Sequence, residues 1–147
     1  TLVRYLVDYV SSLYKGQVLE TILQDVLDTP VSPELLPQKD DKIVQKTEDI
    51  VGPYELHDFF IYHMVRFGDE PRKLYKKTKL AFKDKYDKDT IKKWLRLFYW
   101  RFFSQQFKRS CIPDGPKVGS VALSPRGDWR MPSDANVQIW LDEVEKI

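Results

Sequence analysis

Apolar residues recur at helical spacing through most of this chain, and Gly, Pro or Asp separates one apolar stripe from the next. The first two stripes occupy residues 2–13 and 18–27, with Gly16 between them and Asp28-Thr29-Pro30 after the second. Residues three and four positions apart share one face of a helix, so each stripe predicts an amphipathic helix. The chain is therefore predicted to be mainly α-helical.

The middle of the chain continues the same pattern. A helix is predicted from Tyr54, with one apolar face formed by Leu56, Phe59, Phe60, His63 and Met64. Gly68 is expected to end that helix, Asp69 to be the N-cap of the next, and Pro71 to lie in its first turn.

The longest stripe follows Asp89, which is predicted to cap its helix. Its broad aromatic face consists of Ile91, Trp94, Leu95, Phe98, Phe102 and Phe103. A face this apolar belongs in a core. Further on, residues 118–123 are expected to form a short strand or extended segment, and residues 136–145 a terminal helix.

Residues 37–53 interrupt the periodic pattern. They are polar and show no sustained repeat, so we expect a long and mobile loop. Before the loop, Ser32-Pro33-Glu34 is typical of a helix start. The acidic pairs Asp40-Asp41 and Glu48-Asp49 suit magnesium only together with phosphate oxygens and water, and their spacing alone is a weak signal.

Composition excludes several classes of protein. A hydrophobic content of 42% and an aromatic content of 14% suffice for a packed core, and a net charge of +2 creates no strong field toward nucleic acid or membranes. No apolar run is long enough to span a bilayer. The single Cys111 allows no internal disulfide and favours a reducing, cytoplasmic location. The chain opens at Thr1 without Met, which favours an excised fragment.

Motifs for common chemistries do not occur. The sequence contains no GxxxxGK[ST], GxGxxG or HExxH motif and no nucleophile elbow. His57 and His63 are six positions apart and face different sides of a helix, so structural roles are favoured and no metal site is predicted. Cys111 has no histidine nearby in sequence and is interpreted as a passive thiol.

Two basic regions invite a functional interpretation. Residues 72–96 carry a run of Lys and Arg that suits either nucleic-acid binding or a solvated helix face, and the solvated face is favoured. Residues 104–134 combine turn residues with five cations, namely Lys108, Arg109, Lys117, Arg126 and Arg130. Cations at a helix end followed by free backbone amides suit a phosphate or carboxylate ligand.

Three separated stretches resemble the C-terminal part of glutamine-dependent NAD synthetase. They are Asp28-Thr29-Pro30-Val31-Ser32-Pro33-Glu34-Leu35-Leu36-Pro37, the run from Lys46-Thr47-Glu48-Asp49 through Gly52-Pro53-Tyr54 to Phe60, and Gln106-Phe107-Lys108-Arg109. Their order and spacing agree with that family over most of the chain. The long tail after Arg109 resembles the glutamine-dependent branch rather than the shorter ammonia-dependent one.

The resemblance implies a fold and a reaction. The fold is the helical C-terminal portion of a larger α/β, adenine-nucleotide alpha-hydrolase-like synthetase domain, spanning residues 1–147. In that family, ATP adenylates the nicotinate carboxylate of deamido-NAD, and ammonia, derived from glutamine, then displaces AMP to give NAD. ATP and magnesium are therefore implied for the full-length parent. Its further partners would be the remaining synthetase and glutaminase domains and further copies in a dimer or larger oligomer.

The resemblance also assigns residues. Lys108 is implied to hold deamido-NAD, with Phe107 at the family's His position, where it can stack but cannot donate a hydrogen bond. Ser32 takes the place of a Thr that contacts ATP. Residues 37–53 match a loop that closes over the site. The apolar tail, residues 110–147, is expected to pack on a neighbouring domain or subunit.

The family's Ser-Gly-Gly-x-Asp-Ser pyrophosphatase loop does not occur in this chain. The chain is therefore expected to be inactive by itself. Two other interpretations remain open from sequence alone. One is a basic helical nucleic-acid-binding module, and the other is a structural assembly domain whose helices bury a subunit interface.

Overall fold

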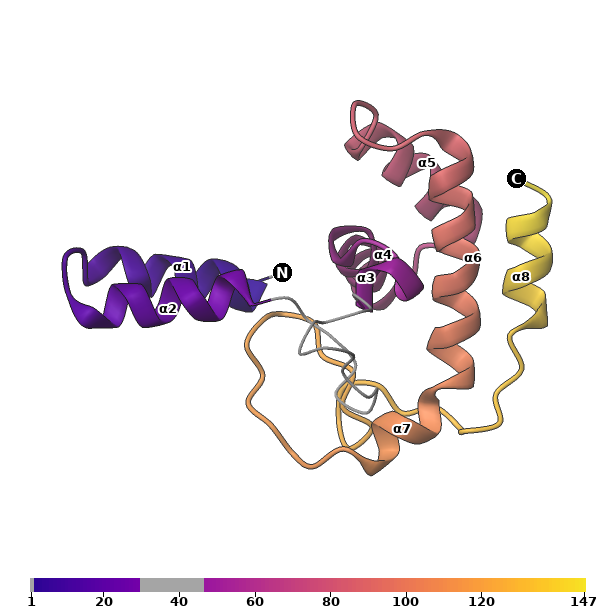
Figure 1. The fold of residues 1–147 in the computed structure, drawn as a ribbon. Helices are drawn as coiled ribbons and strands as arrows, with labels where there is room; N and C mark the ends of the chain where they lie inside the picture. Colours follow the sequence, from indigo (N-terminus) through magenta and orange to yellow (C-terminus); the bar gives the residue numbers. More distant parts are fainter. Residues whose placement is uncertain (1, 30–46) are drawn as a thin grey trace, which may run out of the picture. The chain divides into compact units, whose positions relative to one another are not determined.

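The computed structural model describes residues 2–29 and 47–147, and within these residues the regular structure is entirely helical (Figure 1). The predicted mainly α class is confirmed. The chain divides into two compact units, Thr1–Tyr54 and Glu55–Ile147, which are described separately. Ser32, Asp40-Asp41 and the first ten residues of the predicted loop lie outside the described residues.

The first unit contains a helical hairpin. Helices α1 (Leu2–Leu13) and α2 (Val18–Asp28) pack against each other, as their apolar stripes predicted. Gly16 lies in the turn with φ of 78°, a left-handed conformation that glycine adopts without strain. Its backbone N–H donates to the Glu20 carboxylate at 2.7 Å, which fixes the turn against the start of α2.

A short helix, α3 (Thr47–Val51), occupies part of the segment that was predicted to be a loop. The Glu48 carboxylate accepts a hydrogen bond from the Tyr54 backbone N–H at 3.0 Å. Gly52 ends the helix with φ of 93° and donates its N–H to the Glu48 carbonyl at 2.8 Å. Five residues are too few for a visible apolar period, so the sequence pattern did not reveal this helix.

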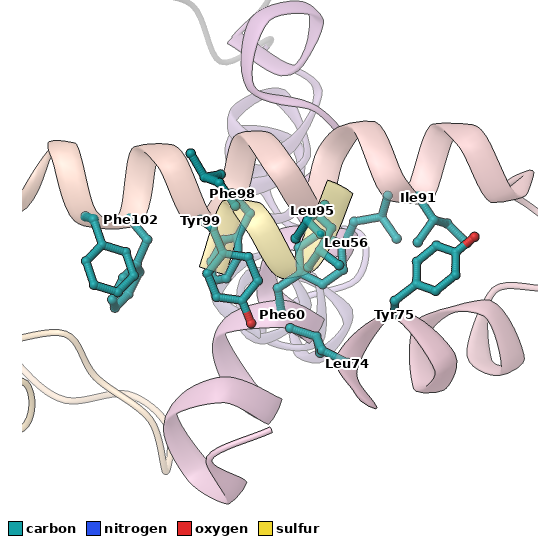
Figure 2. Close-up of a cluster of buried hydrophobic side chains, with 12 residues drawn as sticks. Leu56, Phe60, Leu74, Tyr75, Ile91, Leu95, Phe98, Tyr99 and Phe102 are labelled. Carbon is teal, nitrogen blue, oxygen red and sulfur yellow. The ribbon is translucent and has the colours of Figure 1, made fainter. Parts of the chain in front are cut away.

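The second unit is organised around the long helix α6 (Lys88–Ser104), which packs against α5 (Pro71–Ala81) and α8 (Gln138–Glu145). Helix α4 (Tyr54–Phe67) contributes Leu56 and Phe60 to the same core. Figure 2 shows these two side chains together with those of α5 and α6 in one cluster. The buried side chains of α6 are Ile91, Leu95, Phe98, Tyr99, Phe102 and Phe103. The predicted aromatic face is therefore confirmed as core except for Trp94, which is only partly buried, and Tyr99 belongs to the core in addition.

The helix caps were predicted only in part. Gly68 ends α4 with φ of 63° and donates to the Met64 carbonyl, as expected. Pro71 is the first residue of α5, but the N-cap is Glu70 rather than Asp69, because the Asp69 side chain is buried among other partners. The N-cap of α6 is Asp87 rather than Asp89, since Asp87 accepts from the Thr90 N–H at 2.7 Å.

The end of α6 leads into the tail. Gln105 interrupts the helix, and α7 (Gln106–Cys111) follows it. Residues 118–123 form no strand in this structure, and Gly119 and Ser120 lie in a bend. Helix α8 confirms the predicted terminal helix and begins two residues later than expected. There the Asn136 side chain accepts from the Gln138 N–H at 2.7 Å, as in an Asx turn.

The apolar side chains of the tail pack on the chain's own core. The Trp129 ring meets Phe102 edge-on at 5.3 Å between centroids, and the Trp140 ring lies 4.5 Å from Phe103. Leu141 and Val144 are buried in the same cluster. These contacts account for most of the apolar content that led us to expect an external partner. Packing of the tail on another domain or subunit stays a prediction, for which Ile112 and Val118 are exposed.

Candidate functional site

Helix α7 presents two of the residues that the resemblance assigned to deamido-NAD. Phe107 and Lys108 are both exposed, and 51% of the Phe107 surface is accessible. Among the residues that the structure describes, no ion pair or side-chain hydrogen bond is recorded for the Lys108 ammonium. A ring and a cation are therefore exposed at consecutive positions of one short helix, and these two kinds of side chain suit a ligand with a planar and an anionic part.

Gln106 and Arg109, which flank Phe107 and Lys108 in the sequence, hold α7 in place. Gln106 is fully buried, and its side-chain amide donates to the Met131 carbonyl at 3.1 Å. The same amide accepts from Arg109 Nε at 2.9 Å. Gln106 thereby joins α7 to a tail segment 25 residues further along the chain. Both functions of the amide are used, so this polar side chain is buried with its hydrogen bonds satisfied.

The Arg109 side chain contacts the preceding helix, α6. Its guanidinium donates to the Phe102 carbonyl near the end of α6 and lies 4.6 Å from the centre of the Phe102 ring. Burial lowers the pKa of Arg109. A cation with these partners stabilises the junction of α6 and α7. We therefore assign Gln106 and Arg109 to holding α7, and Phe107 and Lys108 to its exposed side.

Most cations of the tail have partners within the tail. Lys117 pairs with Asp128 at 2.6 Å, and Arg126 pairs with Asp114 at 3.3 Å. Arg130 donates to the Arg126 carbonyl at 3.0 Å. The backbone amides of Gly127 and Trp129 both donate to the Ser124 carbonyl. The side chains of Lys117, Arg126 and Arg130 and the amides of Gly127 and Trp129 are therefore not free as predicted, and Lys108 is the best placed of the five cations for an anion.

A charged cluster that the sequence pattern did not reveal lies where α4 meets α5. The Asp69 side chain is fully buried and pairs with Lys73 at 2.8 Å, with Lys77, and with His63 Nδ1 at 3.1 Å. His63 also packs against Phe59, with ring centroids 4.3 Å apart. The cluster ties the end of one helix to the start of the next. Within residues 2–29 and 47–147, no three His, Cys, Asp or Glu side chains converge as a metal site.

Asp69 should make the stability of the second unit depend on pH. Burial alone would raise the pKa of Asp69, but hydrogen bonds and charges from Lys73 and Lys77 outweigh it and lower the pKa to about 2 from an ordinary 3.8. A depressed folded-state pKa means that the stabilisation is complete above pH 4 and is lost as pH falls toward 2. Both lysines are partly exposed, so its size is on the order of 1 to 2 kcal/mol.

Asp69→Asn should accordingly lower the free energy of unfolding at pH 6, and its difference from the natural chain should shrink between pH 4 and pH 2. Urea unfolding at a series of pH values measures this. Asp84→Asn, at an exposed carboxylate after α5, is the control and should leave the profile unchanged. A constant deficit of Asp69→Asn across the whole range would contradict the assignment.

The basic run of α5 and α6 is largely engaged within the chain. Lys73 and Lys77 form ion pairs with Asp69, and Lys85 pairs with Glu55 at 2.6 Å. Near the other end of the run, Arg96 pairs with Glu145 at 2.6 Å. Lys79 and Lys93 lie over the rings of Tyr75 and Trp94. Cations with intramolecular partners favour a solvated structural face over a nucleic-acid surface.

No helix among the described residues has the length and apolar character needed to cross a membrane.

Comparison with known proteins confirms the family resemblance. No family model matches the chain. Glutamine-dependent NAD(+) synthetase of Mycobacterium leprae is 43% identical over 99% of this chain, and the proteins of that name from Mycobacterium bovis and Mycobacterium tuberculosis are 39% identical over the same share. The chain spans about a quarter of these relatives, 24% of their length. The aligned region covers 166 residues for a chain of 147, so the M. leprae relative carries residues here that this chain lacks.

Proposed function

We propose that this chain, a homologue of one quarter of the glutamine-dependent NAD(+) synthetases, is the C-terminal portion of such an enzyme. The observation that carries the proposal is identity of 39–43% across 99% of the chain. Because the match covers 24% of the relatives, the activity belongs to a longer protein. This chain would contribute its helices and one wall of the active site.

The reaction we propose for the parent has two steps. A carboxylate oxygen of the nicotinate ring of deamido-NAD attacks the α-phosphorus of ATP, and pyrophosphate leaves. Ammonia, released from glutamine, then attacks the activated acyl carbon, and AMP leaves to give NAD. Activation is needed because a free carboxylate is a poor electrophile, and cations near the phosphates stabilise the charge that develops on them.

We assign α7 to the binding of deamido-NAD. Lys108 would pair with an anionic group of this substrate, and Phe107 would stack on a planar one. Their shared exposure on a helix that Gln106 and Arg109 hold in place supports the assignment. Binding in a fixed orientation lowers the entropic cost of bringing the carboxylate to ATP.

ATP and magnesium are proposed for the parent. Ser32 remains our proposal for an ATP contact, although it lies outside the described residues. The Glu48 carboxylate already accepts from the Tyr54 backbone, and the described residues offer no magnesium donor set. The ligands of the metal would therefore lie in the remainder of the parent.

The remaining features of the parent are also proposals. Its partners would be the other synthetase and glutaminase domains of the same enzyme and further copies in an oligomer. A cytoplasmic location suits the one free thiol, Cys111, which is exposed.

NAD formation tests the proposed function. The longer protein should convert deamido-NAD to NAD with ATP and either glutamine or ammonium, while the isolated 147-residue chain should give no NAD above the blank. The reason is that the chain has no phosphate-binding loop. Turnover by the isolated chain, or none by the longer protein with either nitrogen source, would overturn the proposal.

A further inference from the structure

Arg101 lies in the last turn of α6, and its side chain has no partner within the described part of the chain. The Nε atom is buried without a hydrogen bond, and the guanidinium makes no ion pair there. The residue as a whole is only partly buried, so it lies at the surface of the unit and not in its core. A buried N–H donor without an acceptor is unfavourable, and more so when it is charged. Such a group is expected to meet a ligand, an ion or water.

The other arginines of this region show that the missing partner is particular to Arg101. Arg96, on the same helix, pairs with Glu145 at 2.6 Å. Arg109, on α7, donates from Nε to the Gln106 amide at 2.9 Å. Both find acceptors among the described residues, whereas Arg101 finds none there. Arg101 is therefore free to bind an acceptor that these residues do not supply.

Arg101 is close in the chain to the residues that we assign to deamido-NAD. The chain passes from α6 through Gln105 into α7, where Lys108 is exposed seven positions after Arg101 (Figure 1). At a helical rise of about 1.5 Å per residue, this separation corresponds to roughly 10 Å. One turn before Arg101, the centre of the Phe98 ring lies 6.0 Å from that of His57 on α4. Arg101 thus lies along α6 between its contact with α4 and the start of α7.

The substrate of the proposed reaction carries two kinds of anionic group. Deamido-NAD has a carboxylate on its nicotinate ring and a pyrophosphate between its two ribosyl groups. The carboxylate must attack ATP, and a guanidinium that held both of its oxygens would lower its nucleophilicity. The pyrophosphate does not react, and its oxygens match the planar fork of an arginine. The pyrophosphate is therefore the better acceptor for a fixed arginine.

We propose that Arg101 is a second cation of the deamido-NAD site, together with Lys108, and that it binds the pyrophosphate of this substrate. The inference rests on the proposed function, because it takes deamido-NAD as the ligand. Two cations on successive helices hold a flexible dinucleotide at two points. Its orientation is then fixed more firmly than by one contact, which lowers the entropic cost of bringing the carboxylate to ATP. The acceptor that Arg101 Nε lacks arrives with the substrate.

Removing the guanidinium should not destabilise the longer protein when no substrate is bound. Arg101→Met keeps an unbranched stem and removes the buried N–H that has no acceptor. Its melting temperature should equal or exceed that of the natural protein. The control Arg96→Met removes an exposed ion pair and should also change the melting temperature little. A clearly lower melting temperature for Arg101→Met alone would show that an acceptor of the protein uses the guanidinium, and would overturn the inference.

Isothermal titration calorimetry of the longer protein with three nucleotides identifies the ligand. Deamido-NAD and NAD share the pyrophosphate and differ at the ring, which carries a carboxylate in the first and an amide in the second. Arg101→Met should raise the Kd of both on the order of 10- to 100-fold and leave the Kd of ATP unchanged. Arg101→Lys keeps the charge but not the planar fork, so it should recover part of the affinity. Arg96→Met should leave all three Kd values unchanged.

Other ligands of Arg101 give different patterns of binding. Weaker binding of deamido-NAD alone would assign Arg101 to the carboxylate. Weaker binding of ATP alone would assign it to the phosphates of ATP. Unchanged binding of all three nucleotides would show that Arg101 contacts none of them. Each of these three results overturns the inference.

NAD formation by the same preparations separates this inference from the proposed function. If the natural longer protein forms NAD while Arg101→Met binds every nucleotide as the natural protein does, the inference alone fails. If the natural longer protein neither binds deamido-NAD nor forms NAD, the proposed function fails and the inference fails with it.

Discussion

Replacing Lys108 with alanine in the proposed full-length synthetase should raise the KM for deamido-NAD by roughly 30- to 150-fold. A charge-assisted contact contributes about 2 to 3 kcal/mol, and each 1.4 kcal/mol is a factor of ten. The exposed ammonium on α7 is the basis for this expectation. Steady-state kinetics with deamido-NAD as the varied substrate measures the change.

Two further variants make the Lys108 experiment specific. Lys108→Arg keeps the charge and should recover part of the affinity. Lys83→Ala removes an exposed lysine after α5 and should leave KM and kcat unchanged. If Lys108→Ala has the kinetics of the natural enzyme, Lys108 does not contact the substrate.

Replacing Gln106 with leucine should destabilise the second unit by about 2 to 4 kcal/mol. The substitution keeps most of the volume but leaves the Met131 carbonyl and Arg109 Nε without the partners that Gln106 gives them. A buried polar group that loses its partner costs about 1 to 3 kcal/mol, and these two groups are part-buried, so each is expected in the lower part of that range. Urea unfolding of the chain at pH 7 measures the loss.

A matched control exists on α8. Gln138 makes one side-chain hydrogen bond, to Asp142 at 2.7 Å, and this bond is exposed. Gln138→Leu should therefore change the free energy of unfolding by less than about 0.5 kcal/mol. Equal effects of the two substitutions would show that the buried amide of Gln106 does not stabilise the junction of α7 with the tail more than an exposed amide would.

The spacing of apolar residues predicted the helices well, because the face of a helix that is buried in the core must be apolar. Leu56 and Phe60 on α4, and the aromatic face of α6, are the side chains that exclude water in the folded unit. Gly68 was predictable because few other residues adopt its positive φ without strain. These signals are local, so they can be found within a few residues of sequence.

The polar contacts were not predictable to the same extent. Asp87 and Asp89 both suit an N-cap, and only the backbone shows that Asp87 accepts from Thr90. Asp69 also looked like a cap, but His63 and Lys77 approach it from two different helices. No local rule identifies such partners, because they depend on how the helices pack.

The same reason limited the prediction of the candidate site. Sequence resemblance singled out Gln106-Phe107-Lys108-Arg109, but only the structure separates the exposed central pair from the two residues that hold α7. The Met131 carbonyl that receives the Gln106 amide is 25 residues away. The ion pairs that neutralise Lys117 and Arg126 likewise join positions 11 and 12 residues apart in an irregular segment.

A crystal structure of the longer protein with deamido-NAD tests the central claim most directly. We expect an anionic group of deamido-NAD at about 3 Å from the Lys108 ammonium, with the Phe107 ring against a planar part of the substrate. Deamido-NAD bound elsewhere, with Phe107 and Lys108 both in solvent, would contradict the account.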